Sequence, residues 1–555
     1  MNTYTRRTLL SASIAAAGAG LLSGCSGSGS SESGPRTGSA RSSEPARNSG
    51  PERNSGPGRN SGPAEGGRGF VPKGPEGYVN PSDPEVLAVE RERGSGPVRT
   101  FRFTAAETSV DLGGKTVRTW TYGHDVPGKE VRVTAGDILD LTLVNHLPVG
   151  TTLHTHGARL RCDMDGVPWL TQAPIEPGAD FRYRFAVSHP GTYLLHSHEG
   201  MQLDRGLYAP LIVEDPKEPL SYDREWVVVL DDWLDGVAGS TPDGVLLQLH
   251  KGKAPRMDMG GGPSGHAHHD TPARGPSRIL RHSHSTLLDG MGGNVAYPYY
   301  LVNGRLPHAP SVFRARPGDR IRLRIINAGG DTPFRVALGG HELTVTHTDG
   351  YPVKHRTTDA LLLGMSERYD VLVTAKDGVF PLVALAEGKN ARALAVLRTD
   401  RSRGLPPPSV HPDELDRRVV PARRMAPDDS VAYSDREPDR HIRIKLTGNM
   451  KQYNWAFDHR PYSVEQRHPV RQGERVRLTL INATDMWHPI HLHGHTFALM
   501  GFGDTGTRKD TAIVLPHRKL VFDFYADNPG LWMLHCHNQY HSESGMMTIL
   551  GYLKN

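Results

Sequence analysis

The chain has 555 residues, and its 65 basic and 60 acidic side chains leave a formal net charge of only +5. A charge this close to neutral for the length argues against a dedicated nucleic-acid-binding protein. Three cysteines cannot form a disulfide framework, and 62 glycines with 43 prolines favour turns and short strands over long helices.

The first 25 residues resemble a bacterial export signal. Arg6 and Arg7 precede an apolar run over residues 9–22, as in a twin-arginine signal, and residues 22–25 resemble the cleavage box of lipoproteins. The apolar run is too short to span a bilayer comfortably. We therefore expect export by the twin-arginine route, to the cell envelope or the outside, with a lipid on Cys25 as the only membrane attachment.

Residues 26–97 are expected to form a disordered linker. The unit Arg-Asn-Ser-Gly-Pro recurs every six residues between positions 47 and 63. Such a segment has few apolar side chains to bury, so its expected role is to give the folded part reach from the membrane.

A ten-residue pattern at 136–145 recurs at 318–327 and at 473–482. Each copy begins with Gly and an acid, alternates polar and apolar residues, and ends in Asn, which is typical of a turn and a half-buried strand. The sequence therefore predicts an all-β chain with three copies of one sandwich or barrel domain. We place the domains at 98–217, 218–402 and 438–555, with a linker at 403–437.

Paired histidines occur at matching positions in the first and third copies. Each of these copies has a His-x-His-Gly nine residues after the Asn and a second His-x-His near its end, whereas the middle copy has apolar residues at both places. The pairs are His154 and His156, His196 and His198, His491 and His493, and His535 and His537. Four pairs at matched offsets are hard to explain as ordinary surface or core histidines.

The spacing of each pair indicates metal binding. In a strand, His-x-His points both imidazoles to one face, roughly 6.6 Å apart, which suits two neighbouring ions better than one. Eight nitrogens from two domains suit about three ions, with positions left open for a small ligand. Open, imidazole-rich sites favour copper among the redox metals.

Cys536 lies between His535 and His537 and should therefore point to the opposite face. Two imidazoles and a thioether stand near it in the sequence: His488, His541 and Met546. One thiolate, two imidazoles and a long thioether contact are the ligand set of a blue-copper electron-transfer centre. The first copy lacks these residues, so we expect this centre in the third domain alone.

Together these motifs resemble the copper-binding motifs of three-domain multicopper oxidases, the laccase-like proteins, over roughly residues 98–555. The resemblance implies cupredoxin-like Greek-key domains and four copper ions. It implies a type 1 copper held by His488, Cys536, His541 and Met546, a type 2 copper held by His154 and His491, one type 3 copper held by His156, His196 and His537, and a second held by His198, His493 and His535.

The resemblance also implies a mechanism. A donor reduces the type 1 copper one electron at a time, the electrons pass from Cys536 to its histidine neighbours, and O2 is reduced to water at the other three ions. Asp165 is a candidate proton donor, although residues 162–166 are also compatible with a plain turn. Ser542 stands where many bacterial relatives carry an acid, so Glu543 is the second candidate. We expect Cys162 to be buried and uninvolved.

The electron donor has several candidates. Residues 256–291 are rich in Met and His, which suit Cu(I) and resemble inserts of bacterial copper-resistance oxidases; the alternative is a solvated loop. We expect Cu(I), phenols or aromatic amines as donors, and a role in copper tolerance. The alternatives are Fe(II), Mn(II) or a pigment precursor as the donor, or a copper-binding protein without turnover. Because one chain carries both halves of the cluster, we expect a monomer, with the middle domain as a spacer.

Overall fold

The computed structural model describes residues 70–251, 275–501 and 505–554. The predicted export signal, Cys25 and the repeats of the linker lie outside these residues. Within the described ranges, no helix is both long enough and apolar enough to cross a membrane.

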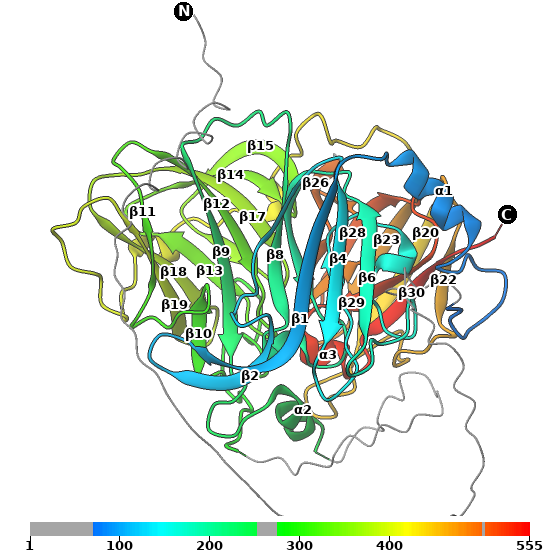
Figure 1. Cartoon of the computed structure of the whole chain (residues 1–555), viewed down its shortest axis with the longest axis horizontal. Coiled ribbons are helices and arrows are strands. Elements are labelled where there is room, and N and C mark those ends of the chain that lie inside the picture. The colour runs from blue at the N-terminus through cyan, green and yellow to red at the C-terminus, as the bar shows by residue number, and fades with distance from the viewer. Residues whose placement is uncertain (1–69, 252–274, 502–504, 555) are drawn as a thin grey trace, which may run out of the picture. The chain divides into compact units, whose positions relative to one another are not determined.

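Three consecutive domains, each with two β-sheets, make up the described chain, which confirms the predicted all-β class (Figure 1). In domain 1 the sheet orders are β2-β1-β4-β6 and β3-β8-β7-β5. The strands are β1 (Val98–Asp111), β2 (Thr116–Tyr122), β3 (Val131–Thr134), β4 (Ile138–Asn145), β5 (His154–His156), β6 (Asp180–Ala186), β7 (Gly191–His196) and β8 (Tyr208–Glu214).

Domain 2 has a six-stranded sheet, β10-β9-β12-β17-β14-β15, and a five-stranded sheet, β11-β19-β18-β13-β16. Its strands are β9 (Arg224–Trp233), β10 (Tyr299–Val302), β11 (Ser311–Arg314), β12 (Arg320–Asn327), β13 (Phe334–Leu338), β14 (Leu343–Thr348), β15 (Tyr351–Thr358), β16 (Leu361–Leu363), β17 (Arg368–Thr374), β18 (Val379–Ala386) and β19 (Ala391–Arg398).

Domain 3 repeats this plan with the sheets β21-β20-β23-β28-β25-β26 and β22-β30-β29-β24-β27. Its strands are β20 (Arg440–Thr447), β21 (Ala456–Phe457), β22 (Arg467–Val470), β23 (Arg475–Asn482), β24 (His488–Leu492), β25 (Phe497–Met500), β26 (Thr505–Lys509), β27 (Thr511–Val514), β28 (Lys519–Tyr525), β29 (Leu531–Cys536) and β30 (Met547–Tyr552).

The three repeated segments take the same place in their domains. They form the strands β4, β12 and β23. Each of these strands pairs in parallel with the first long strand of its domain, β1, β9 or β20. One expectation is wrong: β12 is not half-buried but buried along nearly its whole length. Its Arg322 and Arg324 are buried because both pair with Asp370 of β17 instead of facing solvent.

The predicted disordered linker extends too far toward its C-terminal end. Residues before 98 include the helix α1 (Pro84–Glu92), which buries Val86 and Val89. The backbone of Val79 donates to the Tyr552 carbonyl, 2.8 Å away, at the edge of domain 3. Pro84 at the start of the helix, followed by apolar residues three apart, gives this segment something to bury, unlike the repeats before it.

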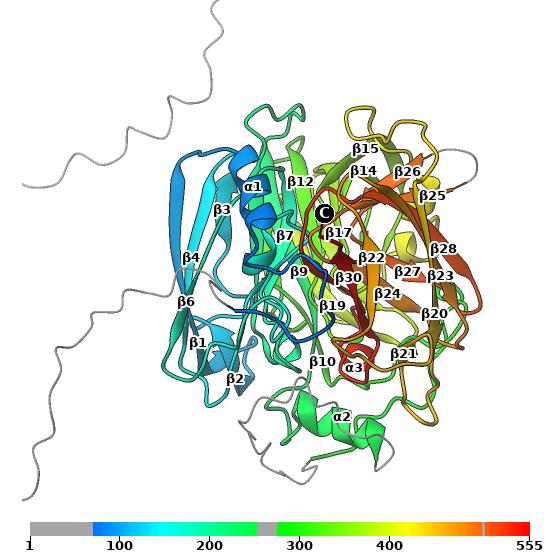
Figure 2. The ribbon, with the colours of Figure 1, turned by 90° about the vertical axis from the view of Figure 1, so that its right-hand side faces the viewer.

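Domains 2 and 3 share one continuous apolar core, whereas much of domain 1 has a core of its own. Figure 2 shows the blue-to-cyan strands of domain 1 on one side and the orange-to-red strands of domain 3 on the other, with β7 and β9 nearer the middle. Two helices, α2 (Pro242–His250) and α3 (Gln539–Ser542), lie at the same end. His250 Nε2 and Ser544 Oγ, 2.8 Å apart, connect the ends of these two helices.

Candidate metal centres

Strand pairing brings the histidine pairs together in two sets. In domain 1, β5 runs antiparallel to β7, and His154 is opposite His196. In domain 3, β24 runs antiparallel to β29, and His491 is opposite His535. Because alternate residues of a strand share a face, each domain presents four imidazoles from one pair of neighbouring strands.

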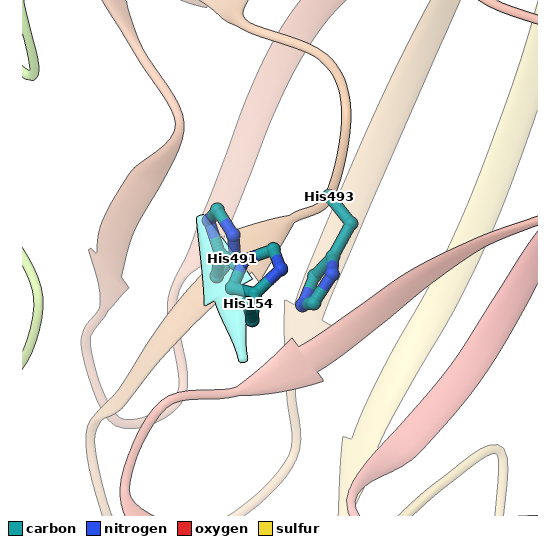
Figure 3. Close-up of side chains that lie close together, drawn as sticks. All are labelled: His154, His491 and His493. Atoms are coloured by element: carbon teal, nitrogen blue, oxygen red, sulfur yellow. The ribbon is translucent and has the colours of Figure 1, made fainter. Parts of the chain in front are cut away.

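The two sets of imidazoles meet between domains 1 and 3. The ring centroids of His154 and His493 are 3.9 Å apart, and those of His156 and His491 are 3.7 Å apart. Figure 3 shows the ring of His154, from β5, beside the rings of His491 and His493. Every one of these side chains is buried.

The remaining four imidazoles also lie close together: those of His196, His198, His535 and His537. The centroid of His198 lies 5.1 Å from that of His535, and the centroid of His196 lies 5.3 Å from that of His537. The structure thus brings together all eight histidines that the four motifs predicted. We refer to them as the histidine cluster.

Most of these imidazoles have one buried nitrogen with no hydrogen-bond partner among the described residues: Nε2 of His154, His196, His198, His491 and His537, and Nδ1 of His156. The Nε2 atoms of His493 and His535 face each other at 3.1 Å. Buried polar atoms without partners are costly, so this convergence needs an explanation. Metal ions would supply it, since each nitrogen has a free lone pair in the neutral imidazole.

Asp165 holds one histidine from each side of the cluster. Its backbone carbonyl accepts a hydrogen bond from His154 Nδ1 at 2.7 Å, and its Oδ2 accepts one from His493 Nδ1 at 2.9 Å. This fixes the tautomer of both rings and leaves Nε2 of each to face the cluster. The candidate proton donor is therefore in direct contact with the histidines.

Asp510, between β26 and β27, does the same for another pair. Its Oδ1 accepts from His156 Nε2 at 3.0 Å, and its carbonyl accepts from His491 Nδ1 at 2.9 Å. Burial raises the pKa of Asp510, but the Arg368 guanidinium beside it holds that pKa well below its usual range. Asp510 is therefore ionised, and its carboxylate accepts the hydrogen bond from the imidazole N–H of His156.

Burial favours the neutral form of two of the cluster imidazoles, His493 and His535. Burial lowers the pKa of His493 and of His535 well below the ordinary range, and the neighbouring histidines lower both further. The neutral form is the one that binds metal ions, so little proton displacement is needed for loading at neutral pH.

Cys536 and two imidazoles form a second site within domain 3, which we call the Cys536 centre. Cys536 Sγ lies 3.6 Å from His488 Nδ1 and 3.7 Å from His541 Nδ1, and the two nitrogens are 3.1 Å apart. All three side chains are buried, and burial raises the pKa of the Cys536 thiol. A bound metal ion would supply the positive charge that makes the thiolate the stable form.

The imidazoles of the Cys536 centre are held by neutral side chains. His488 Nε2 lies 2.9 Å from Thr484 Oγ1, and His541 Nε2 lies 2.7 Å from the amide nitrogen of Asn294, a domain 2 residue. The Trp455 ring packs against His541 with centroids 4.4 Å apart. These contacts fix both rings with Nδ1 toward the sulfur.

Met546 is buried, and its backbone carbonyl accepts a hydrogen bond from Cys536 N at 3.0 Å, which places it beside the centre. Glu543 follows His541 by two residues, and burial raises its pKa to about 7. Glu199, which the motifs did not indicate, directly follows His198; burial and then the charge of Glu543 raise its pKa to about 8.

Several supporting residues were missed by reasoning from the motifs. They are Asp510, Arg368, Ser366, Asn294, Thr484 and Glu199. For Asp510, the one available signal is its place in the strand connection that follows the third His-x-His-Gly. Cys162 is buried, as expected, and its sulfur contacts the backbone nitrogen and oxygen of Leu531.

Comparisons with known proteins agree with this geometry. Three family models described as multicopper oxidase match residues 104–218, 265–402 and 435–552. The chain is 48% identical to multicopper oxidase MmcO of Mycobacterium tuberculosis, over 83% of this chain and 88% of that protein. It is 29% identical to copper resistance protein A of Escherichia coli, over 80% of this chain and 91% of that protein.

Solved structures show the same fold. The laccase from Botrytis aclada aligns with a TM-score of 0.65 and 25% identity, over 83% of this chain and 89% of the laccase. Fet3p, a multicopper oxidase that functions in iron import, aligns with a TM-score of 0.67 and 24% identity, over 82% of this chain and 90% of that chain.

Proposed function

This chain belongs to the multicopper oxidase family, and from that premise we propose that it couples one-electron oxidation of Cu(I) or a phenol to four-electron reduction of O2 to water. The observation that carries the proposal is the convergence of eight buried imidazole nitrogens directly beside the Cys536 centre. We propose aromatic amines as further electron donors.

We propose four copper ions. The type 1 ion is assigned to His488, Cys536, His541 and Met546; the type 2 ion to His154 and His491; and the type 3 ions to His156, His196 and His537 and to His198, His493 and His535. When bound, copper supplies the one-electron chemistry at the first site and the reduction of O2 at the other three. The ligand atoms lie within 4.8 Å of one another in two of these sets, which supports both assignments: His198, His493 and His535, and His488, Cys536 and His541.

The chain itself connects the two sites. Cys536 is bonded through the backbone to His535 on one side and His537 on the other. The Cys536 carbonyl also accepts a hydrogen bond from His535 Nδ1 at 3.0 Å. The donor site and the O2 site can therefore be separate while remaining connected by a few bonds.

We propose that three acids, one buried and two half-buried, bring protons to the cluster. Asp165 is in place because its Oδ2 already accepts a hydrogen bond from His493. Glu543 and Glu199 have raised pKa values, about 7 and about 8, so each holds a proton over part of the neutral range. This is the property that a general acid needs.

The surroundings of the Cys536 centre support Cu(I) as a donor. Much of the Met- and His-rich stretch (Met257, Met259, His266, His268 and His269) lies outside the described residues. The chain on either side of it is held at the centre: His250 contacts Ser544, and the Met291 carbonyl accepts from Trp487 Nε1 at 2.7 Å. The thioether and imidazole side chains of this stretch are of the kind that binds Cu(I).

We further propose that the protein is an exported, lipid-anchored monomer that contributes to copper tolerance. The identity with copper resistance protein A supports this role. Growth of a deletion strain on copper tests it, and equal tolerance of the deletion strain would exclude the physiological role without affecting the enzymatic one.

Oxygen uptake by the copper-loaded protein tests the enzymatic proposal. We expect the highest kcat/KM with Cu(I), a lower value with a phenol and lower values with Fe(II) and Mn(II). A higher value with Fe(II), Mn(II) or a pigment precursor would replace the donor. An absence of uptake with every donor would favour a copper-binding protein without turnover.

A further inference from the structure

The middle domain reaches the histidine cluster, although its own repeat positions carry no histidine. The contact is made by Arg368 at the start of β17, whose side chain is fully buried. Its guanidinium makes two parallel hydrogen bonds to Asp510, Nη1 to Oδ1 and Nη2 to Oδ2, both 2.7 Å long. Paired contacts of this kind fix both the position and the plane of the carboxylate.

Arg368 also donates hydrogen bonds to backbone carbonyls of domains 1 and 2. Its Nε donates to the Thr192 carbonyl of domain 1 at 3.0 Å, and its Nη1 donates to the Ser366 carbonyl at 3.1 Å. The Asp349 carboxylate accepts the Arg368 backbone N–H at 2.9 Å and the Asp510 backbone N–H at 3.2 Å. One buried side chain thus joins all three domains.

The pair formed by Arg368 and Asp510 lies directly under the first His-x-His-Gly motif. Gly157 has φ near 84°, and a Cβ at that position would collide with Arg368 Nη2 and Asp510 Oδ2. The glycine of the motif is therefore needed for the close approach of the ion pair to the strand that carries His156.

The ion pair determines how His156 faces the cluster. His156 is the histidine whose unpartnered buried nitrogen is Nδ1, because its Nε2 is used on Asp510 Oδ1 and Thr511 Oγ1, each 3.0 Å away. Domain 2 supports a second ring as well, since Ser366 Oγ lies 3.3 Å from His537 Nδ1. His156 and His537 belong to the same type 3 ion in the proposed assignment.

We propose that Arg368 is a positioning residue for this type 3 ion: through Asp510 it holds His156 in the tautomer that presents Nδ1, so that binding of the ion depends on a domain 2 side chain. The inference rests on the proposed copper assignment. Domain 2 is then a structural part of the cluster and not a spacer.

The test compares Arg368→Met with Arg322→Met in the copper-loaded full chain. Arg322 is the matched control, because it is a buried domain 2 arginine that pairs with Asp370 and not with Asp510. Copper per chain, blue absorption and the electron paramagnetic resonance signal are measured for each. Loss of such a supporting contact typically weakens metal binding about 10–100-fold.

We expect Arg368→Met to lose copper from the type 3 pair while keeping the blue absorption. Its integrated resonance signal per copper should rise, because the remaining ion of a coupled pair becomes visible. Arg322→Met should keep both the wild-type copper content and the wild-type signal. Wild-type values in Arg368→Met, or equal copper loss in both variants, would overturn the inference.

A milder variant covers the case in which Arg368→Met does not fold. Arg368→Lys keeps the positive charge but cannot make the two parallel hydrogen bonds to Asp510, so it should produce the same change in the resonance signal to a smaller extent. An unchanged signal in folded Arg368→Lys would then overturn the inference. Wild-type protein that binds no copper would instead refute the proposed function, so the two failures are distinguishable.

Discussion

The histidine cluster and the Cys536 centre are both built from buried, neutral imidazoles, but different groups hold these imidazoles. At the cluster, the carboxylates of Asp165 and Asp510 accept hydrogen bonds from ring N–H groups. At the Cys536 centre, Thr484 and Asn294 occupy the corresponding places, and both are neutral.

Charge balance explains the difference. Eight neutral imidazoles would bring no negative charge to the three ions proposed for the cluster, so nearby carboxylates would be needed to offset the mutual repulsion of these ions. The Cys536 centre would hold one ion in the proposed assignment, and its thiolate would then supply a negative charge. A further carboxylate there would favour Cu(II) over Cu(I) and make the centre a weaker acceptor of electrons.

The largest effect is expected when the Cys536 centre is removed and the histidine cluster is left without it. Cys536→Ser removes the thiolate and with it the site that accepts electrons from the donor. We expect the blue absorption to disappear and oxygen uptake to fall to background, because the cluster is then without its electron supply. Absorption and oxygen-electrode measurements check this.

Copper content separates this result from a general failure to fold. Cys536→Ser should lose one copper per chain and keep the three of the cluster, since Cys536 and the cluster nitrogens are distinct ligands. Loss of all copper, or persistent oxygen uptake with a phenol, would contradict the division into two regions.

The next largest effect is expected when a cluster histidine receives a neutral hydrogen-bond partner, as the histidines of the Cys536 centre have. Asp165→Asn replaces a carboxylate with an amide of the same shape, so His493 keeps a hydrogen bond but loses a negative neighbour. We expect copper affinity at the cluster to fall about 10–100-fold, with the blue absorption unchanged. Competition against a chelator measures the affinity, and an equal loss at both regions would contradict the charge argument.

The fold and the converging histidines followed from local patterns, whereas the residues that hold these histidines did not. The repeat at 136–145 and the His-x-His spacing depend on residues close in sequence, and strand geometry converts them into faces. Asp510 supports His156 from 354 residues away. Nothing local encodes such a contact, which exists because domains 1 and 3 meet.

Burial by another domain also explains the error at β12. Alternation of polar and apolar residues indicated that Arg322 and Arg324 face solvent, but domain 1 supplies Thr192, whose hydroxyl lies 3.0 Å from Arg324 Nη1. A strand pattern shows which residues share a face, not what covers that face. The same limitation hides Arg368 from the sequence, because it sits in no motif.

A smaller effect is expected when a histidine of the Cys536 centre receives a carboxylate as its hydrogen-bond partner, as the histidines of the cluster have. Thr484→Asp and Thr484→Asn have nearly the same shape and differ in charge beside His488. The carboxylate should stabilise Cu(II) by roughly 1.5–3 kcal/mol, as hydrogen bonds to charged groups do. Redox titration of the blue absorption should therefore give a lower reduction potential for Thr484→Asp than for Thr484→Asn, and equal potentials would contradict the comparison.

The smallest effect is expected from two acids, each one or two residues after a histidine of one region. Burial raises the pKa of Glu199, beside His198, to about 8 and that of Glu543, near His541, to about 7. An unfolded Glu has a pKa of about 4.3. The folded chain therefore binds more protons than the unfolded chain, and its stability falls as the pH rises through 7 and 8.

In the copper-free protein, the melting temperature should therefore be lower at pH 8 than at pH 5. Glu199→Gln should reduce this difference more than Glu543→Gln, because the pKa of Glu199 is raised further. Replacement of the exposed Glu465 by Gln is the control and should leave the difference as in the wild type. If Glu199→Gln and Glu543→Gln both keep the wild-type difference in melting temperature, the two acids are already ionised at neutral pH and cannot act as proton donors there.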